Sequence, residues 1–330
     1  KSPKLHLNLS YPNKLKFGQV LVKIKYSGIC GAQINEIDAV KGKDNFLPHL
    51  LGHEGSGIVL EVGEGVKNVS KGDNVILHWK KNLGIECEVP KYKFKNKTIN
   101  AGWVTTFNER AIVSENRLTK ISKKVNLKTA TLFGCSLTTG FGVVNNEANV
   151  KIGQSVLVIG VGGVGLNIVQ ASSLVSASPI IGIDINNFKL KLAKKFGMSH
   201  GLLNNKKLKD NILKILGNFN PDIVFETTGR SEMIEFAYEI TSAKGKTILV
   251  GVPNKRIKLY TLPLHFEKIL KGSEGGKIVP SVDIPNYLKI IKEKKIDLNK
   301  IITHEFKLDK INEAIKLFRK GLAGRIVIKM

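Results

Sequence analysis

Cysteine is scarce in this sequence, with three among 330 residues. Three thiols cannot form a fully paired disulfide framework, which excludes the small secreted folds that such frameworks hold together. The start of the chain also lacks the charged, then apolar, then small residues of a secretory signal. We therefore expect a cytoplasmic protein. Because the chain begins at Lys1 and not at methionine, we expect a short N-terminal piece, such as a first strand, to precede it.

Acidic residues are few relative to basic ones, 27 against 52, so the formal net charge is +25. A charge of this size raises the question of a nucleic-acid partner. The lysines are spread along the whole chain, however, without an arginine-rich block, an interleaving of aromatic and basic residues or a recognition helix. We expect a solvated lysine-rich surface rather than a nucleic-acid interface. Its positive field favours anionic substrates and dinucleotides.

One segment, from Ser155 to Ile183, has no charged residue at all. Its length would suffice for a membrane span. Four glycines within six residues, and then Pro179, divide it into a β-rich run, a helix-length run and a second β-rich run. This is the pattern of strands buried on both faces of a parallel sheet, so we expect no membrane span.

The length and the 42% apolar content suit a soluble globular protein with two domains of ordinary size or one large domain. Up to about residue 145, short β-branched runs between turns predict strands at 20–27, 55–63, 73–79 and 110–114. From about residue 150, strands and helices alternate, which predicts an α/β domain with a doubly wound parallel sheet. The tail after Asp283 predicts helix, strand, helix and strand, and periodicity leaves its domain open.

Residues 160–165 read GVGGVG, follow a predicted strand and open a predicted helix. In this G-x-G-x-x-G pattern, Gly160 permits the turn, Gly162 lets the backbone approach a pyrophosphate, and Gly165 lets the helix pack on the strand. A glycine-rich turn that binds another anion is the alternative. The predicted cofactor-binding loop consists of Gly160, Gly162, Gly163, Val164 and Gly165.

Asp184 ends the next predicted strand, 24 residues after Gly160. A carboxylate at this point can accept hydrogen bonds from an adenosine ribose and would repel a 2′-phosphate. No arginine follows at 185–187, so NAD is favoured over NADP, although Lys189 keeps NADP open. The alternative role for Asp184 is that of an acidic residue at a helix N-terminus.

Candidate metal ligands stand in three separate motifs: Cys30 in GICG, His53 and Glu54 in LGHEGSG, and Cys135 in FGCSLTTG. Two thiolates and one imidazole make the three-ligand set of a catalytic zinc, whose fourth position is open. Taken singly, a buried cysteine is a good core residue and a histidine in a glycine turn is usually hydrogen-bonded. Their coincidence with a dinucleotide loop favours the metal.

These motifs occur in the same order in the zinc-containing medium-chain alcohol dehydrogenases, a family that the sequence resembles over essentially its whole length. The motifs that carry the resemblance are GICG at 28–31, GHEGSGIV at 52–59, GC at 134–135, GVGGVG at 160–165 and LVGVP at 249–253. The resemblance implies a β-rich, GroES-like catalytic domain formed by residues 1–145 and 283–330, and a Rossmann dinucleotide-binding domain at 146–282. Homodimers and homotetramers are common in the family, and we expect one of them here.

The resemblance also implies roles for individual residues. Cys30, His53 and Cys135 would bind zinc, and Glu54 would be an exchangeable ligand or lie just behind the ligands. The nicotinamide would lie near Thr139 and the backbone of Val250, Gly251 and Val252. Arg325 would reach the pyrophosphate.

The sequence departs from the family after the first zinc cysteine. Ala32 stands where many members have the serine or threonine that relays the alcohol proton, and alanine cannot relay one. Gln33 stands where an aspartate commonly orients the zinc histidine; its amide can still hydrogen-bond an imidazole but adds no negative charge. Asn35 stands where some members of the family have a histidine that relays the proton. Thr139 or a water chain would then carry the proton, or the site is weakened or performs different chemistry.

The structural zinc of the family is expected to be absent. It requires four closely spaced cysteines, and the corresponding segment, residues 80–97, has only Cys87. We therefore expect one catalytic zinc and no structural zinc.

The sequence as a whole predicts a zinc-dependent oxidoreductase that transfers hydride between NAD(H) and an alcohol, polyol, aldehyde or ketone. The first alternative is a metal-free quinone or enone reductase of the same fold. The second is a basic dinucleotide-fold binding protein with a weakened active site.

Overall fold

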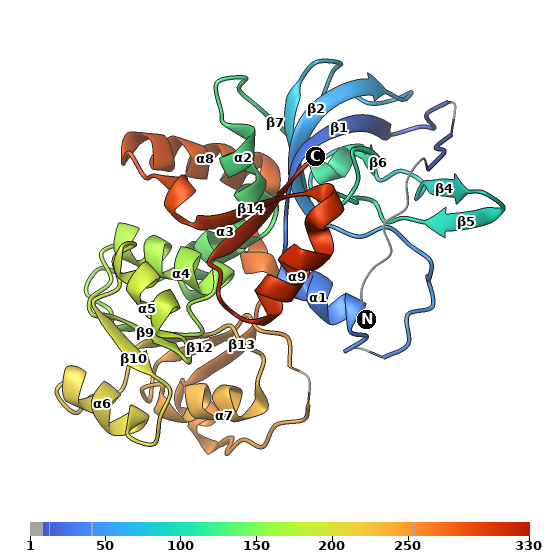
Figure 1. Ribbon diagram of the computed structural model, residues 1–330. Helices are drawn as coiled ribbons and strands as arrows, with labels where there is room; N and C mark the ends of the chain where they lie inside the picture. The colour runs from blue at the N-terminus through green and yellow to red at the C-terminus, as the bar shows by residue number, and fades with distance from the viewer. Residues whose placement is uncertain (1–8, 13, 41, 254) are drawn as a thin grey trace. The chain divides into compact units, whose positions relative to one another are not determined.

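The computed structural model describes residues 9–12, 14–40, 42–253 and 255–330 (Figure 1). The chain divides into two compact units. Unit 1 comprises residues 1–138, 279–320 and 325–330, and unit 2 comprises 139–278 and 321–324. In the described part of the chain, no helix combines the length and apolarity that crossing a bilayer requires.

Unit 1 is built on a seven-stranded sheet of order β14-β15-β1-β2-β3-β7, in which β6 also pairs with β1, and on a separate β4-β5 hairpin. Its strands are β1 (Gln19–Gly28), β2 (Glu54–Val62), β3 (Asn74–His78), β4 (Lys91–Phe94), β5 (Lys97–Asn100), β6 (Arg110–Ser114), β7 (Leu118–Ile121), β14 (Ile302–Lys307) and β15 (Arg325–Lys329). Its α-helices are α1 (Gly31–Ile37), α2 (Leu127–Ala130), α8 (Pro280–Glu293) and α9 (Ile311–Arg319), with short 3-10 turns η1 (Glu115–Arg117), η2 (Thr131–Gly134), η6 (Leu298–Lys300) and η7 (Leu308–Lys310).

The apolar residues of β1 explain why this sheet forms. Val20, Val22 and Ile24 alternate along the strand and pack in one buried cluster with residues of β2, β3 and β6. Leu21 lies on the other face and packs with Ile112 in a second cluster. Because side chains alternate between the two faces of a strand, both faces of β1 are covered.

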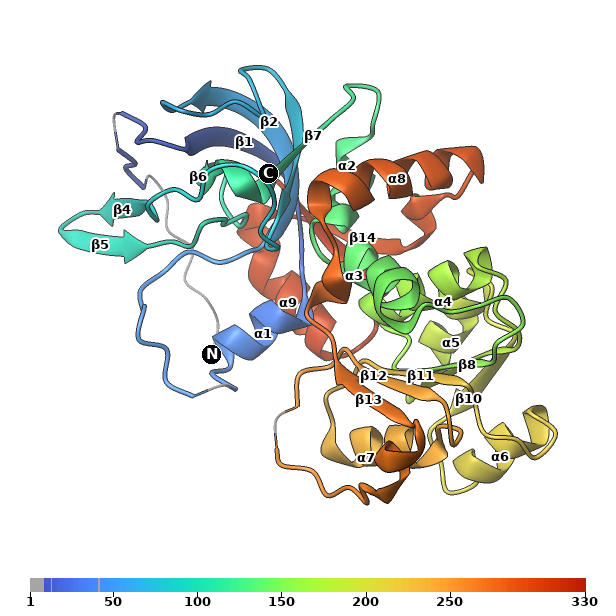
Figure 2. The same cartoon turned by 180° about the vertical axis from the view of Figure 1, so that it is seen from behind.

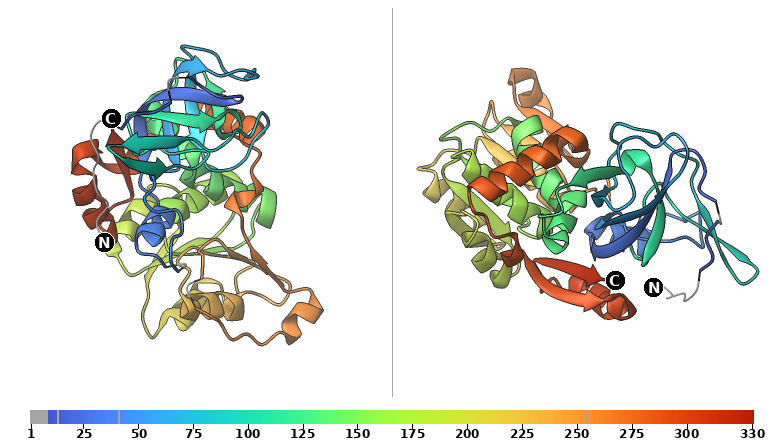
Figure 3. Two further views of the ribbon diagram at one scale, coloured as in Figure 1. Left: turned by 90° about the vertical axis from the view of Figure 1, so that its right-hand side faces the viewer. Right: turned by 90° about the horizontal axis from the view of Figure 1, so that it is seen from above.

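The two ends of the chain meet in this sheet. Strand β15 pairs antiparallel with β1, with Tyr26 opposite Lys329. The red C-terminal strands β14 and β15 therefore continue the sheet that begins with the blue strand β1 (Figure 3). Periodicity leaves the domain of this tail open, and the structure places it in unit 1 except for residues 321–324, which belong to unit 2.

Unit 2 contains a six-stranded sheet of order β10-β9-β8-β11-β12-β13, in which all pairs are parallel. Its strands are β8 (Val156–Ile159), β9 (Ile180–Asp184), β10 (His200–Leu203), β11 (Ile223–Glu226), β12 (Lys246–Leu249) and β13 (Ile269–Gly272). Its helices are α4 (Gly163–Leu174), α5 (Asn187–Lys194), α6 (Leu208–Ile215), α7 (Ser231–Ile240), the π-helix η3 (Val143–Ala148), and the 3-10 turns η4 (Leu262–Phe266) and η5 (Gly275–Lys277). Helix α3 (Ser136–Gly142) spans the unit boundary.

Helices lie on both faces of this parallel sheet (Figure 2). On one face, α6 and α7 pack against β8, β9 and β11 in a single apolar cluster that includes Leu157, Ile183 and Ile212. The uncharged run from Ser155 to Ile183 forms β8, α4 and β9, which confirms its predicted division into strand, helix and strand. The predicted α/β class, with a doubly wound sheet in one unit and a β-rich second unit, is likewise confirmed.

The strand order of unit 2 reverses beside β8. The chain proceeds from β8 outward through β9 and β10, then returns to pair β11 on the other side of β8. In open parallel sheets, ligands bind outside the carboxyl ends of the strands at such a reversal. The glycine loop that begins at Gly160 stands at this point.

Candidate active site

Cys30 is held at the junction of a strand and a helix. It follows the end of β1 and has an extended backbone as the residue before α1. The carbonyl oxygen of Cys30 accepts hydrogen bonds from the N–H groups of Gln33 and Ile34, at 3.1 and 3.4 Å. The first turn of α1 therefore fixes the position from which the Cys30 side chain extends, and that side chain is buried.

His53 directly precedes β2 and follows a glycine whose conformation is required. Gly52 has φ of +91°, and a Cβ added to it would collide with Thr106. On its other side, the Gly52 N–H donates to Oε1 of Gln33. Residue 52 must therefore be glycine, because an L side chain rarely adopts this conformation and would find no space.

Cys135 lies between the turn η2 and helix α3. Its side chain is buried, and its carbonyl oxygen accepts a hydrogen bond of 3.0 Å from Oγ1 of Thr138. Elements far apart in the sequence thus supply the three predicted ligands, and the structure brings all three together within unit 1.

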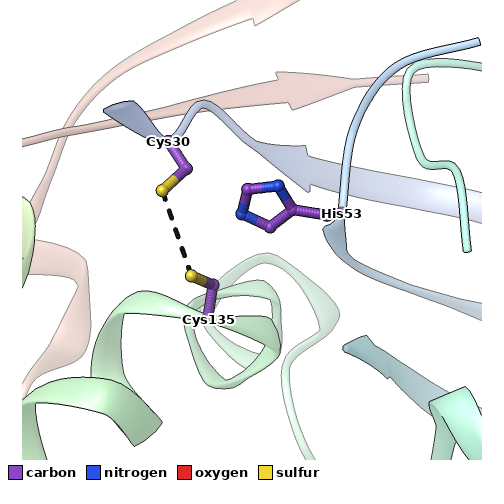
Figure 4. Close-up of side chains that lie close together, drawn as sticks. All are labelled: Cys30, His53 and Cys135. Atoms are coloured by element: carbon purple, nitrogen blue, oxygen red, sulfur yellow. Dashed lines mark hydrogen bonds between the residues drawn. The ribbon is translucent and has the colours of Figure 1, made fainter. Parts of the chain in front are cut away.

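The three side chains face one another (Figure 4). One ligand atom from each, the sulfurs of Cys30 and Cys135 and a ring nitrogen of His53, lies within 4.8 Å of the other two. The two sulfurs are 3.9 Å apart and form no disulfide. With Zn–S bonds of about 2.3 Å, two sulfurs of a tetrahedral zinc site are about 3.8 Å apart. The sulfur separation therefore fits zinc.

A second observation supports the fit. Nε2 of His53 is buried and has no hydrogen-bond partner. A buried polar atom without a partner is costly, since it has lost water and gained nothing in return. A metal ion bound by the trio would satisfy such an atom, so the residues present suit a Cys₂His zinc site.

The electrostatics of the trio favour a thiolate at Cys30. The hydrogen bond with Cys135 is the largest influence that lowers the pKa of Cys30, with His53 and Arg325 acting in the same direction. Burial opposes them, but the net pKa is well below its ordinary value. Because the thiolate is the form that binds metal, this environment prepares Cys30 as a ligand.

Glu54 and Arg325 form a buried ion pair behind the trio. Nη2 of Arg325 donates to Oε1 of Glu54, and Oε2 of Glu54 accepts the N–H of Ser136 at 3.3 Å. Burial lowers the pKa of Arg325, and the neighbouring Cys30 opposes this shift. Glu54 is not one of the three residues whose ligand atoms converge. The predicted roles of Glu54 as an exchangeable ligand and of Arg325 at the pyrophosphate stay predictions.

The interpretation that Gln33 hydrogen-bonds the imidazole requires correction. Its Oε1 accepts the Gly52 N–H, and its Nε2 donates to Oε2 of Glu36 at 2.6 Å. Both ends of the carboxamide are thus bound to groups other than the ring of His53. The geometry of α1 decides this, because it directs Gln33 toward the backbone before His53.

In unit 2, the glycine loop has the conformation that its sequence predicts. Gly160 has φ of +86°, and a Cβ on Gly165 would collide with the carbonyl oxygen of Gly160. Gly162 precedes α4, while Gly163 and Val164 form its first turn. Strand and helix therefore meet closely at the N-terminus of α4, where backbone N–H groups and the helix dipole favour an anion.

Asp184 is fixed beside this loop. Its Oδ2 accepts the N–H of Val161 at 3.1 Å, and its Oδ1 accepts the N–H of Asn186 at 2.9 Å. The ammonium of Lys189 lies 4.0 Å from Oδ2. The carboxylate is buried at the end of β9 and is tied to both segments that flank it.

The remaining predicted cofactor residues lie in two further segments of the chain. Thr139 is buried in α3. The N–H groups of Val250 and Gly251 both donate to the carbonyl oxygen of Glu226, at 2.7 and 2.9 Å, and Val252 is exposed. Their predicted places beside the nicotinamide stay predictions.

Sequence reasoning missed Glu226, which orders the loop after β11. Its carboxylate accepts the N–H groups of Thr228 and Gly229 at 2.7 and 3.0 Å, and the Thr228 hydroxyl. Burial raises the pKa of Glu226, and these hydrogen bonds oppose the rise. A carboxylate that ends an otherwise apolar strand, as in DIVFE, was the available signal.

Cys87 lies apart from the trio. Burial raises its pKa, and its N–H donates to Oγ of Ser114 at 2.9 Å. Within the described ranges, the potential metal-binding groups of three or more side chains are Cys30 with His53 and Cys135, and Glu36 with Asp44 and His49. Cys87 belongs to neither group.

Comparisons with known proteins agree with this geometry. Two family models match the chain: an alcohol dehydrogenase GroES-like domain at 16–123 and a zinc-binding dehydrogenase at 163–293. S-(hydroxymethyl)glutathione dehydrogenase of Escherichia coli O6:H1 is 32% identical, over 95% of this chain and 93% of the relative. This chain belongs to the zinc-containing medium-chain alcohol dehydrogenase family. The predicted family, and with it a zinc-dependent alcohol oxidoreductase, is confirmed.

Further relatives of this alcohol dehydrogenase cover nearly its whole length. Alcohol dehydrogenase 2 of Oryza sativa subsp. japonica is 32% identical over 94% of this chain and 90% of the relative. Benzyl alcohol dehydrogenase from Acinetobacter calcoaceticus has the same fold, with a TM-score of 0.87 at 24% identity over 98% of this chain and 94% of that one. The apo form of zinc-dependent alcohol dehydrogenase 2 from Streptococcus pneumonia is similar at a TM-score of 0.83 and 25% identity, over 98% and 94%.

Proposed function

We propose that this alcohol dehydrogenase binds one catalytic zinc through Cys30, His53 and Cys135, and that it uses NAD(H) in preference to NADP(H). The observation that carries the zinc proposal is the convergence of two sulfurs and one imidazole around a buried, unpartnered nitrogen. When bound, such a zinc acts as a Lewis acid on an alcohol or carbonyl oxygen, while the nicotinamide supplies or accepts the hydride. The structural zinc of the family has no cysteine set here, since the chain holds three cysteines in all.

The residues of the chain prepare this chemistry before any ligand arrives. Cys30 and Cys135 are buried and His53 is half-buried, and the lowered pKa of Cys30 favours its thiolate form. Glu54 forms a buried ion pair with the guanidinium of Arg325, which also lies near Cys30. Ala32 offers no hydroxyl for the substrate proton, so we propose that Thr139 or a water chain carries it.

The preference for NAD rests on Asp184. Two backbone N–H groups hold its carboxylate beside the glycine loop, at the end of the strand where an adenosine ribose is expected. A 2′-phosphate placed there would face this fixed negative charge. Lys189, 4.0 Å from the carboxylate, offsets part of that repulsion, so the preference is a matter of degree.

For the substrate, we propose a small alcohol or carbonyl compound that carries negative charge. The net charge of +25 would attract such a molecule and raise its rate of encounter, with a dependence on ionic strength. The E. coli relative is named for a glutathione adduct, and glutathione is itself an anion at neutral pH. Both observations favour an anionic substrate, and the low cysteine content favours a cytoplasmic location.

The decisive experiment joins metal analysis to turnover. Zinc per chain is measured by plasma mass spectrometry after mild purification, in the wild type and in Cys30→Ser. Oxidation of a panel of neutral and anionic alcohols is followed with NAD and NADP. We expect about one zinc per chain, lost together with turnover in the variant. Unchanged zinc and turnover in Cys30→Ser would refute the site, and tighter binding of NADPH than NADH would refute the preference.

We also propose that the chain forms a homodimer through strand β13. This strand is an edge of the unit 2 sheet. The N–H groups of Ile269 and Ser273 bond toward β12, so those of Leu270 and Gly272 face the open edge. Apolar side chains are exposed in the segment before β13 and at its first residue: Tyr260, Leu262, Leu264, Phe266 and Ile269. An open strand edge beside apolar surface normally pairs with another chain or is protected by charged side chains.

A second copy suits this edge because the pairing is self-complementary. A two-fold axis at Leu270 would place that residue opposite its own copy, so that the two Lys271 residues are not opposite each other. This arrangement is favourable, because like charges directly opposite each other destabilise a strand pair. Light scattering tests the proposal with Phe266→Asp. We expect this variant to be monomeric and Ile152→Asp, which changes another exposed apolar residue of unit 2, to remain dimeric. A dimeric Phe266→Asp would refute it.

A further inference from the structure

The carboxamide of Gln33 joins the two N-terminal ligands of the metal trio. Gln33 lies in the first turn of α1 and is 6% exposed. Its own N–H bonds back to the carbonyl oxygen of Cys30, at 3.1 Å. Its side-chain oxygen accepts the N–H of Gly52, the residue directly before His53. Two segments that carry ligands 23 positions apart are thus tied by one side chain.

Glu36 fixes which end of the carboxamide faces Gly52. Oε2 of Glu36 lies 2.6 Å from Nε2 of Gln33, and a carboxylate accepts hydrogen bonds but does not donate them. The amide nitrogen must therefore face Glu36, and the amide oxygen must face the Gly52 N–H. The hydrogen-bond network leaves no freedom for the reversed orientation.

The opposite flank of the His53 segment is held separately. The N–H groups of Thr106 and Phe107 both donate to the carbonyl oxygen of Leu51, at 3.2 and 3.0 Å. The Thr106 hydroxyl lies 2.6 Å from that of Ser27 and donates to the carbonyl oxygen of Glu54. The backbone on both sides of His53 is therefore fixed to unit 1, and Gln33 supplies the hydrogen bond that comes from the Cys30 helix.

We propose that Gln33 is a positioning residue of the metal site, which sets the place of His53 relative to Cys30 through the backbone of Gly52 and not through the imidazole. This inference rests on the proposed zinc site. When His53 and Cys30 already lie at the separation that the metal requires, the free-energy cost of metal binding is lower, because fewer groups have to be ordered. Groups that orient metal ligands typically contribute about 10- to 100-fold in metal affinity.

The test uses an exchange of donor and acceptor. In Gln33→Met the side chain keeps its length but loses both hydrogen bonds. In Gln33→Glu an acceptor for Gly52 remains, but two carboxylates then face each other across 2.6 Å. In the double variant Gln33→Glu with Glu36→Gln, the carboxylate of residue 33 accepts from both Gly52 and the new amide. The matched control is Gln170→Met, which changes a glutamine of unit 2 that is also buried.

Zinc affinity is measured by competition with a chromogenic chelator, and the Co²⁺-substituted proteins are compared by their visible absorption. We expect Gln33→Met and Gln33→Glu to lose about 10- to 100-fold in affinity and to show altered Co²⁺ bands. The zinc affinity of the double variant should return to within about threefold of the wild-type value. The affinity of Gln170→Met should equal that of the wild type. Circular dichroism of the zinc-free proteins checks that each variant is folded.

The outcomes separate the two levels of the proposal. Failure of the wild type itself to bind zinc would refute the proposed function. Wild-type zinc affinity with an unchanged Co²⁺ spectrum in Gln33→Met would refute the role of Gln33 while leaving the zinc site intact. A double variant as weak as Gln33→Glu would also count against it, because the exchange restores the hydrogen bonds that the proposal requires.

Discussion

From the surroundings of His78 we predict that the free energy of unfolding falls in mild acid. His78 is fully buried at the end of β3, with Nδ1 2.7 Å from the carbonyl oxygen of Lys80 and Nε2 3.0 Å from Oγ1 of Thr119. A neutral imidazole satisfies both partners, by donating to the carbonyl and accepting from the hydroxyl. Burial lowers the pKa of His78 to about 4, and the charge of Arg117 acts in the same direction.

The size of this loss of stability follows from the difference in the pKa of His78 between the folded and unfolded states. In the unfolded chain the imidazole titrates near its ordinary pKa of about 6.5. Between pH 6.5 and pH 4 the unfolded state therefore takes up a proton that the folded state refuses, and the free energy of unfolding falls as the pH falls. For a pKa of about 4, the loss from this group is about 2 kcal/mol at pH 5 and about 3 kcal/mol at pH 4.

The assay uses the tryptophan fluorescence of unit 1. Both tryptophans of the chain, Trp79 and Trp103, belong to that unit, so urea unfolding followed at their emission reports on it. Wild type and His78→Gln are compared at pH 7.5, 6 and 5, with a metal chelator present so that metal release does not contribute. We expect the wild type to lose about 2 kcal/mol more than the variant between pH 7.5 and pH 5. Parallel pH profiles for the two proteins would refute the reasoning.

Three further substitutions test the site and its surroundings. Gly52→Ala should lower the free energy of unfolding by at least about 1–2 kcal/mol, because of the positive φ and the collision with Thr106, and a wild-type urea midpoint would contradict this. Glu54→Ala should cost about 3–5 kcal/mol, since it leaves the buried Arg325 charge without its partner; a loss below about 1 kcal/mol would mean that the pair is not buried as described. Asp184→Asn should lower the ratio of NADPH to NADH dissociation constants by at least about tenfold in fluorescence titrations, and an unchanged ratio would remove Asp184 from cofactor selection.

Local pattern predicted the parallel sheet well. A strand buried on both faces has to be apolar throughout, so the uncharged run from Ser155 to Ile183 identified β8 and β9 directly. The short strand β7 and the β4-β5 hairpin were missed, because strands of four residues have too few positions to show alternation.

Pairing between distant segments could not be predicted from pattern. Periodicity shows that residues 325–329 form a strand but carries no information on its partner, which is β1 at the other end of the chain. The ligand trio was found because its residue types are rare and its motifs are ordered. The partner of Gln33 was not found, because an amide can bond an imidazole or a backbone N–H equally well, and only the direction of α1 decides between them.

The pairing of β15 with β1 also bears on the order in which the protein is made. Arg325 is translated 271 residues after Glu54, so throughout most of synthesis the carboxylate that lies behind the metal ligands has no counter-charge. During the same interval the stretch of β1 that pairs with β15, Tyr26 to Gly28, is open to other strands, while β6 covers the edge from Gln19 to Lys23. The surroundings of the metal ligands are therefore completed only after β15 has left the ribosome. A nascent or truncated chain without β15 would have a Glu54 that lacks its ion pair, and an unpaired stretch of β1 that could bind other strands.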